Sequence, residues 1–284
     1  LTQKFGLSAA LTTPFKADGN VDIDAMIAHA RRCLANGCDS VTLFGTTGEG
    51  CSVGSRERQI ILSRFIEAGI EPSRLVTGVL VDSIEDAAEQ SAEALSAGAR
   101  NILLAPPSYF KNVSDDGLFA WFSAVFAKIG KDARDILVYN IPSVTMVTLS
   151  VELVGRLREA FPGIVTGVKD SSGNWSHTER LLKEHGDLAI LIGDERDLAR
   201  GVRLGGQGAI SGVANFLTQE VRAMAVDGKD DKRIVDLVVE LLKFPVTPAV
   251  KVLVSHTTGE NIWADVRAPL VTISAEDRRR IEGA

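Results

Sequence analysis

Lys169 is the side chain best placed to form a covalent bond with a substrate. It follows the apolar run 164–168 and precedes Asp170, so it stands at the end of a buried strand and faces a turn. Burial lowers the pKa of a lysine because the ammonium ion loses its water. A neutral amine attacks carbonyl carbons and forms a Schiff base. The alternative is a lysine that reaches into solvent from the strand end.

Further polar residues follow apolar runs in the same way. Tyr139 lies near the end of the run 136–140, and the turn 45–48, which contains Thr46 and Thr47, follows another run. A turn with two hydroxyls and free backbone N–H groups forms a concave anion site, so the carboxylate of a small keto acid could bind there. The alternatives are a packed tyrosine with a satisfied hydroxyl and a solvated turn.

Short apolar runs alternate with longer segments of helical period along most of the chain. This alternation is typical of βαβ units with parallel strands, and continuous apolar strands are typical of a sheet covered on both faces. We therefore predict an α/β fold, a (β/α)8 TIM barrel. An open doubly wound sheet is the alternative, although no G-x-G-x-x-G follows the first run. The predicted strands are 7–11, 40–44, 75–80, 101–105, 136–140, 164–169, 188–192 and 208–211, and the helices between them are 25–35, 55–68, 83–97, 114–128, 151–160, 175–184 and 198–204.

The predicted barrel brings the reactive residues together. In this fold class the chemistry takes place at the C-terminal ends of the strands. Tyr139 and Lys169 stand at the ends of the fifth and sixth predicted strands, and adjacent strands lie about 5 Å apart. Both side chains can therefore point into one cavity.

The strand pattern ends near Gly228, and the remaining sequence is helical in period. Helices are predicted over 232–243, 249–256 and 275–282, with a break at 244–248 that contains two prolines. We expect a catalytic barrel domain over 1–227 and a small C-terminal helical extension over 228–284.

Composition and charge argue against several classes of partner. The net charge is −6 and no block of basic residues occurs, so we expect no nucleic acid. No apolar run approaches the roughly 18 residues of a membrane span, and the first residues show no signal-peptide pattern. Three cysteines without a C-x-x-C pair and four scattered histidines predict neither disulfides nor a metal site. We expect a cytoplasmic protein.

Three motifs stand at the predicted strand ends, namely Gly45-Thr46-Thr47-Gly48-Glu49, Tyr139-Asn140-Ile141-Pro142 and Gly167-Val168-Lys169-Asp170-Ser171-Ser172-Gly173. In this order, and with the opening segment 6–15, they resemble the signatures of the dihydrodipicolinate synthase / N-acetylneuraminate lyase family. The resemblance extends over essentially the whole chain. It implies a TIM-barrel enzyme that uses neither metal nor cofactor and assembles as a homotetramer of dimers.

The resemblance also implies roles for individual residues. Lys169 would form a Schiff base with the keto carbon of pyruvate or another 2-oxo acid, and Tyr139 would relay protons. Thr46 and Thr47 would hold the substrate carboxylate, and the backbone carbonyl of Ile210 would face the site. The protonated imine is an electron sink, so that a carbon–carbon bond β to it can break or form.

Two departures from the family pattern concern the substrate. Dihydrodipicolinate synthases carry an arginine where this chain has Val144, and that arginine grips the carboxylate of aspartate semialdehyde. They also receive a tyrosine from a neighbouring subunit. In this chain gap-free register puts Phe110 at that position, and a one-residue shift would put Tyr109 there. These losses favour a lyase, aldolase or dehydratase that acts on a 2-keto-3-deoxy sugar acid.

Polar residues after the sixth and seventh strands could meet the hydroxyls of such a substrate. Ser171 lies where sialic-acid-cleaving members have a threonine that faces the substrate. Asp194 and Glu195 follow the seventh strand, and carboxylates accept hydrogen bonds from sugar hydroxyls. The alternative is that these two acidic residues cap the next helix.

Three functions follow from these residues. The first is a Schiff-base lyase acting on pyruvate or a 2-keto-3-deoxy sugar acid through Lys169. The second is 4-hydroxy-tetrahydrodipicolinate synthase, which condenses pyruvate with aspartate semialdehyde, with another group in place of the missing arginine. The third is a non-catalytic protein that binds 2-oxo acids. In each case we expect a small-molecule ligand and a homo-oligomer, either a dimer or a tetramer.

Overall fold

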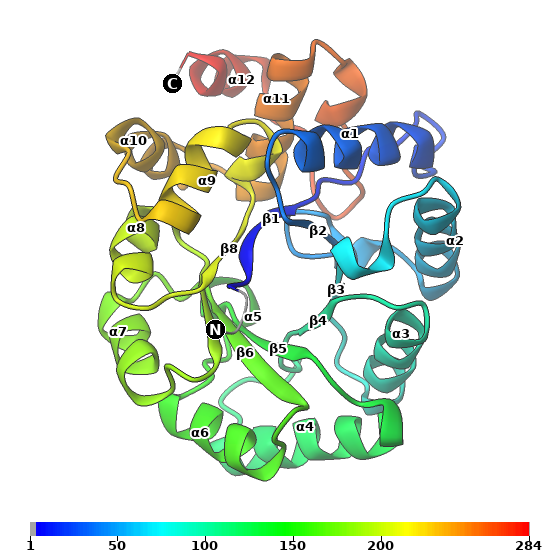
Figure 1. The fold of residues 1–284 in the computed structure, drawn as a ribbon. Coiled ribbons are helices and arrows are strands. Elements are labelled where there is room, and N and C mark those ends of the chain that lie inside the picture. Colours follow the sequence, from blue (N-terminus) through cyan, green and yellow to red (C-terminus); the bar gives the residue numbers. More distant parts are fainter. Residues whose placement is uncertain (1–3, 284) are drawn as a thin grey trace.

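The computed structural model describes residues 4–283, in which eight parallel strands form a closed barrel in sequence order. The last strand, β8, pairs with both β7 and β1 and so closes the barrel. Figure 1 shows the strands inside a ring of helices. The predicted (β/α)8 barrel is confirmed, and the open-sheet alternative is wrong. The strands are β1 (Gly6–Ala10), β2 (Ser40–Leu43), β3 (Leu75–Val79), β4 (Asn101–Leu104), β5 (Ile136–Asn140), β6 (Val165–Asp170), β7 (Ala189–Ile192) and β8 (Gly208–Ser211).

The helices of the ring follow the strands, and several of them begin at a polar residue that caps the helix. Asp22 caps α1 and Ser83 caps α3, and each side chain accepts a backbone N–H three residues ahead. The single-turn α5 and the eighth ring helix, α9, are additions to the predicted set. No described helix is both long and apolar enough to span a bilayer. The helices up to this point are α1 (Ile23–Ala35), α2 (Ser55–Glu67), α3 (Ile84–Ser96), α4 (Asp115–Ile129), α5 (Pro142–Thr145), α6 (Val151–Ala160), α7 (Trp175–Glu184), α8 (Glu195–Arg203) and α9 (Thr218–Asp227).

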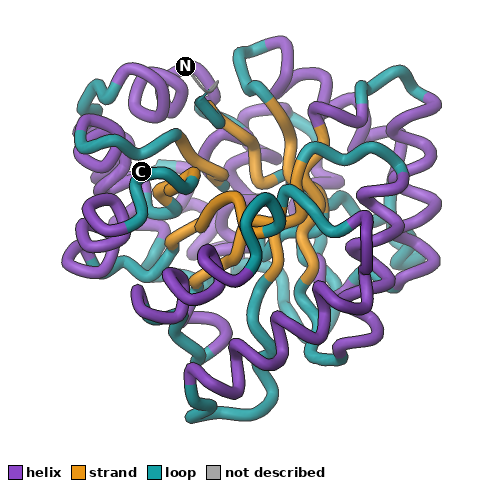
Figure 2. Tube along the Cα trace, turned by 60° about the horizontal axis from the view of Figure 1, so that its bottom comes forward, coloured by secondary structure: helices purple, strands orange, loops and turns teal. Residues whose placement is uncertain are grey.

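Two apolar layers form the core of the barrel, one inside it and one between the strands and the helices. Figure 2 shows the strands at the centre of the molecule, with the helices around them. Successive strand residues face opposite layers. On β5, Leu137 and Tyr139 lie in the inner cluster and Val138 in the outer one. The strands are therefore apolar on both faces because both faces are packed. Tyr139 belongs to the face that points into the barrel.

Three helices follow the barrel: α10 (Lys232–Leu241), α11 (Val246–Thr258) and α12 (Ala275–Glu282). They lie on the side of the ring where α9 and α1 are found, in orange to red in Figure 1. The predicted break at 244–248 is shorter in the structure, because Pro248 occupies the first turn of α11, where a missing N–H is tolerated. Residues 247–255 of α11 are all buried, so this helix packs like a core element. The predicted boundary at residue 227 coincides with the end of α9.

Candidate active site

Lys169 and Tyr139 face each other inside the barrel. They are paired residues of the adjacent strands β6 and β5. The lysine is 6 % and the tyrosine 2 % exposed. The Nζ of Lys169 donates a hydrogen bond of 3.2 Å to the Tyr139 hydroxyl and lies 4.4 Å from the centre of the ring. The expected convergence of these side chains is present, and the solvent-reaching alternative for Lys169 is wrong.

The turn 45–49 lies beside this pair. The Thr46 hydroxyl is 3.5 Å from the Tyr139 hydroxyl. The turn is entered through Phe44 and left through Glu49, both of which have left-handed backbones with φ of 59° and 52°. Within residues 4–283, the backbone N–H groups of Thr46 and Thr47 donate no hydrogen bond to another group of the protein. These N–H groups and the hydroxyls are therefore available to an anion.

A pocket of about 190 Å³ opens above Lys169 at the C-terminal ends of the strands. It contains eight residues to which a site role was assigned from the sequence. Tyr109 is an exception, since it is 77 % exposed and lies outside the pocket of its own chain. The eight residues are Thr46, Thr47, Tyr139, Lys169, Ser171, Asp194, Glu195 and Ile210.

The C-terminal helices supply an apolar wall of the same pocket, a role that the sequence analysis missed. The α10 residues Val238 and Leu241 and the α11 residues Val246 and Val250 line it. Their spacings of three and four place each pair on one helical face. That periodicity marks an apolar face but does not say what the face covers.

Ser171 packs against Gly193, the residue that precedes Asp194 in the chain. A side chain at Gly193 would bring its Cβ within 2.0 Å of the Ser171 hydroxyl, so only glycine fits there. Asp194 caps α8 by accepting the backbone N–H of Arg196 at 3.0 Å, and it is also paired with the Arg196 side chain. The capping alternative is thus correct for Asp194, which nevertheless lines the pocket.

Glu195 is a buried acid in the pocket wall. Its carboxyl oxygen accepts a hydrogen bond of 2.6 Å from the Ser211 hydroxyl on β8. Burial raises the pKa of Glu195, and the adjacent Asp194 raises it further, whereas Lys169 and the Ser211 bond oppose the shift. The glutamate therefore binds a proton more tightly than a solvated carboxylate, and in that form it can donate a hydrogen bond.

Asp170, next to Lys169, points away from the pocket and ties three elements together. Its carboxylate accepts hydrogen bonds from the Asn140 amide on β5 at 2.8 Å and from the Thr178 hydroxyl on α7 at 2.6 Å. It also accepts the backbone N–H of Ser172 at 3.2 Å. The strands that carry Tyr139 and Lys169 are therefore joined one residue beyond this pair, on the side of the barrel wall that faces α7.

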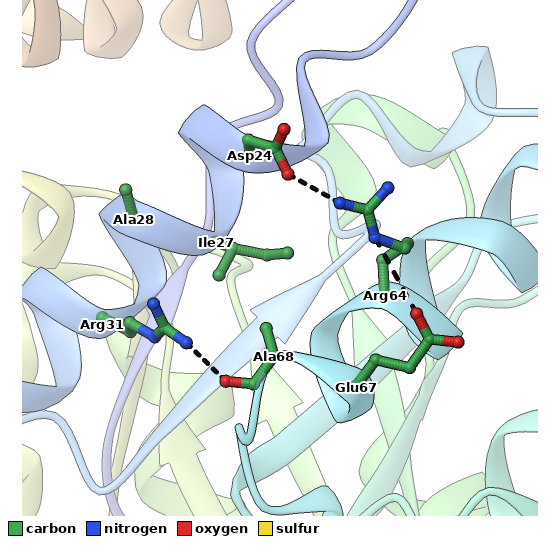
Figure 3. A pocket seen from close by; sticks show the side chains of 7 residues that line it. All are labelled: Asp24, Ile27, Ala28, Arg31, Arg64, Glu67 and Ala68. Carbon is green, nitrogen blue, oxygen red and sulfur yellow. Dashed lines mark hydrogen bonds and ion pairs between the residues drawn. The ribbon is translucent and has the colours of Figure 1, made fainter.

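A second hollow lies on the outer surface between α1 and α2 (Figure 3). Its charged side chains point at one another: Arg64 pairs with Asp24 at 2.8 Å, and Arg31 donates to the carbonyl of Ala68. These charges are satisfied within the wall and lie far from the strand ends in the ring. We therefore place the active site at the strand ends and not here.

Val144 and Phe110 mark the mouth of the barrel. Val144 lines the pocket and is 58 % exposed, and Phe110 is exposed beside Tyr109, with the two rings edge to face at 5.4 Å between their centres. Neither side chain carries a charge. Among residues 4–283, Lys169 is the only basic side chain that lines the pocket, whereas Asp194 and Glu195 are acidic.

Comparison with known proteins agrees with this geometry. A crystal structure of dihydrodipicolinate synthase from Agrobacterium tumefaciens str. C58 is 93 % identical, with a TM-score of 0.98, and the match covers 99 % of this chain and 98 % of that one. A 4-hydroxy-tetrahydrodipicolinate synthase of Sorangium cellulosum is 35 % identical over 77 % of this chain and 72 % of its own length. An uncharacterized DapA-like lyase of Chloroflexus aurantiacus is 31 % identical, over 77 % and 73 % respectively.

The model of the dihydrodipicolinate synthetase family matches residues 3–284, essentially the entire sequence. Both the expected family and the expectation of a lyase are thereby confirmed. With the barrel and the three strand-end motifs already in place, this match establishes that the chain belongs to the dihydrodipicolinate synthetase family.

Proposed function

We propose that the protein is a class I lyase that forms a Schiff base between Lys169 and the keto carbon of pyruvate or a 2-keto-3-deoxy sugar acid. The observation that carries the proposal is the buried lysine–tyrosine pair, joined at 3.2 Å at the base of the pocket. A lysine amine held inside a barrel, with a proton-transferring hydroxyl at hydrogen-bond distance, is suited to carbonyl addition.

The proposed reaction begins when the Lys169 amine attacks the C2 carbonyl of the substrate and forms a carbinolamine. The carbinolamine hydroxyl takes the proton of the Tyr139 hydroxyl and leaves as water, which produces an iminium and a Tyr139 phenolate. The iminium withdraws electrons from C3. In aldol cleavage the C3–C4 bond breaks and its electron pair forms an enamine, while the C4 hydroxyl loses its proton to the Tyr139 phenolate and C4 leaves as an aldehyde. The enamine then takes a proton at C3, and hydrolysis releases pyruvate. The hydroxyls and N–H groups of Thr46 and Thr47 hold the carboxylate throughout, and the carbonyl of Ile210 faces the adduct.

The charges of the pocket wall favour a polyhydroxylated substrate. Among the described residues that line the pocket, a second carboxylate would find no arginine and no lysine other than Lys169, whose nitrogen is bonded to C2 of the substrate. Ser171, Asp194 and Glu195 instead offer hydroxyl and carboxyl groups that exchange hydrogen bonds with sugar hydroxyls. We therefore place the sugar-acid chain along the side of the pocket formed by β6 and β7.

Borohydride trapping tests the proposal. The protein is incubated with pyruvate and borohydride, its mass is measured by mass spectrometry, and the modified residue is located by peptide mapping. We expect one adduct on Lys169, no adduct in Lys169→Ala, and a normal adduct in the matched control Lys232→Ala, since Lys232 is exposed on α10. Absence of a gain in mass, or a gain that persists in Lys169→Ala, would overturn the proposal.

A second candidate is 4-hydroxy-tetrahydrodipicolinate synthase. It is favoured by the names of the relatives, which include a 35 % identical protein called by that name and a 93 % identical structure called dihydrodipicolinate synthase. The uncharged Val144 at the pocket mouth argues against it. Two parallel assays distinguish the candidate functions. One measures the condensation of pyruvate with aspartate semialdehyde, and the other measures the release of pyruvate from a panel of 2-keto-3-deoxy acids. An adduct without turnover in either assay would instead support the non-catalytic binding protein.

We further propose a cytoplasmic homo-oligomer, a dimer or a tetramer. The three free cysteines, Cys33, Cys38 and Cys51, are consistent with a reducing compartment. An exposed apolar patch at the barrel mouth supports self-association. It consists of Tyr109, Phe110, Val144 and Met146, on two loops that Lys111 joins by a hydrogen bond of 3.2 Å to the carbonyl of Thr145.

A further inference from the structure

We propose that the buried ion pair between Glu49 and Lys251 positions the turn 45–49, so that helix α11 sets the geometry with which the substrate carboxylate is bound. The inference rests on the proposed function, since it assigns the turn to a carboxylate. Neither Glu49 nor Lys251 lines the pocket. They are therefore positioning residues and act through the turn.

The pair is fully enclosed. Lys251 Nζ lies 2.6 Å from a carboxylate oxygen of Glu49, and neither side chain has any exposed surface. The same ammonium donates to the carbonyl of Thr13 at 2.8 Å and lies 4.6 Å from the centre of the Phe15 ring. The ammonium is thus surrounded by a carboxylate, a carbonyl and an aromatic ring, all of which belong to buried residues.

Further hydrogen bonds between the C-terminal segment and the turn also hold the turn in place. The other carboxylate oxygen of Glu49 accepts the backbone N–H of Arg267 at 3.0 Å. The Thr247 hydroxyl of α11 donates to the carbonyl of Thr46 at 3.2 Å. From the opposite side, the Thr13 hydroxyl donates to the carbonyl of Gly48 at 2.7 Å. The turn is therefore held at its first threonine, its second glycine and its glutamate.

These bonds constrain the part of the backbone that binds the anion. They engage carbonyls and a side chain, and they leave the N–H groups of Thr46 and Thr47 free. A carboxylate is recognised only if those N–H groups converge on one point. Hydrogen bonds to a buried charge are directional and costly to break. Packing alone could stabilise the turn, but it would not fix the orientation of the N–H groups.

The test separates positioning from stability. Lys251→Met, Glu49→Gln and the double variant are compared with Lys232→Met, which removes an exposed lysine from the same C-terminal segment. Each protein is trapped with borohydride over a range of pyruvate concentrations, and over a range of hydroxyacetone, which offers a similar carbonyl without a carboxylate. The thermal unfolding midpoint is measured alongside.

Each single variant leaves one buried charge without its partner and should lower the midpoint, whereas the double variant removes both charges and should recover most of it. The half-saturating pyruvate concentration of the double variant should nevertheless remain raised about tenfold or more, the equivalent of one lost charge-assisted bond. Its maximal trapping rate and its response to hydroxyacetone should match those of the wild type. Lys232→Met should match the wild type in every measurement.

Two results would overturn the inference. In the first, the double variant recovers the affinity for pyruvate together with the thermal unfolding midpoint. In the second, its affinity for hydroxyacetone falls as much as its affinity for pyruvate. If the double variant does not fold, Thr247→Val serves in its place, because it deletes one bond to the turn while keeping the shape of the side chain. A loss specific to pyruvate supports the inference, and unchanged affinity refutes it. Failure of the wild type to form any adduct would refute the proposed function instead.

Discussion

The hydroxyl of Tyr139 joins the two halves of the site, since both Lys169 Nζ and the Thr46 hydroxyl lie within 3.5 Å of it. Tyr139→Phe removes this atom and leaves the ring in place. We expect turnover to fall by about 10²- to 10⁴-fold, the usual contribution of a positioned acid–base group. The borohydride adduct on Lys169 should still form, because the amine is intact. Steady-state rates and trapping yields check this, and unchanged turnover would exclude Tyr139 as the proton relay.

Glu195 makes stability depend on pH. Because its pKa is raised in the folded protein, the folded state keeps a proton that the unfolded chain releases above a pH of about 4.3. The stabilisation that comes from this Glu195 proton is complete below that pH, and it is lost as the pH rises through the raised pKa of Glu195 in the folded protein. Glu195→Gln abolishes the titration, so the stability of the wild type should decline relative to this variant as pH rises towards neutrality.

Urea unfolding of both proteins across this pH range measures the difference. Glu159→Gln, which alters an exposed carboxylate on α6, serves as the control and should show no such trend. A difference between wild type and Glu195→Gln that stays constant with pH would show that the folded carboxyl titrates normally.

The sequence was sufficient to predict that Lys169, Tyr139 and Thr46 meet in one pocket, but not which residues support them. Lys169, Tyr139 and Thr46 could be predicted because parallel strand ends meet at one face of a barrel. The pairing of Glu49 with Lys251 could not, because two charges 202 residues apart carry no signal of contact. The one hint was a lysine inside the apolar run 249–254, which is an unusual place for a charge.

At the scale of elements, Asp170 links β5, β6 and α7. Asp170→Ala would leave the buried Asn140 amide and Thr178 hydroxyl without their acceptor. An unsatisfied buried polar group costs about 1–3 kcal/mol, so we expect the free energy of unfolding to fall by about 3 kcal/mol. Chemical denaturation measures this loss.

Asp187→Ala provides the comparison, because Asp187 accepts a similarly short bond, 2.6 Å from Arg158, at an exposed site. Surface pairs contribute about 0–1 kcal/mol. Equal losses for the two variants would mean that the Asp170 network adds nothing beyond a surface pair.

The starts of the helices could be predicted with or without a side-chain cap. The helices α2 and α7 begin at the predicted residues 55 and 175, although neither N-cap residue makes a side-chain hydrogen bond. Two capped helices begin earlier than predicted: α1, capped by Asp22, by two residues, and α8, capped by Asp194, by three residues. The helix α9 was missed, and its N-cap is Leu217, which offers no side-chain oxygen to the first N–H groups.

At the scale of the whole molecule, the apolar patch at the barrel mouth is expected to bind another copy of the chain. Replacing Tyr109 and Phe110 together with aspartate would place two charges in the patch and should shift the protein towards monomer. Sedimentation velocity measures the shift. Val271→Asp alters an equally exposed apolar residue outside the patch and should leave the assembly unchanged. Retention of the wild-type assembly by the double aspartate variant would place the interface elsewhere.

The division of the chain into a barrel and a helical extension follows a real change in sequence pattern at Gly228, but the two parts share one site. The pattern could show where the strands stop. It could not show that α10 and α11 fold back over the strand ends, because the apolar faces of Val238 and Val250 fit any partner of similar shape. The position of these helices is a property of tertiary packing.

The contact between Glu49 and Lys251 also makes the turn 45–49 depend on a helix 202 residues away in the chain. Lys251 and the backbone N–H of Arg267, which bond the Glu49 carboxylate, both belong to the C-terminal segment, as does Thr247, which bonds the carbonyl of Thr46. A chain that ended before α11 would lose all three of these bonds and keep the bond from Thr13 to Gly48. The turn is therefore completed only when the last part of the chain has folded onto the barrel.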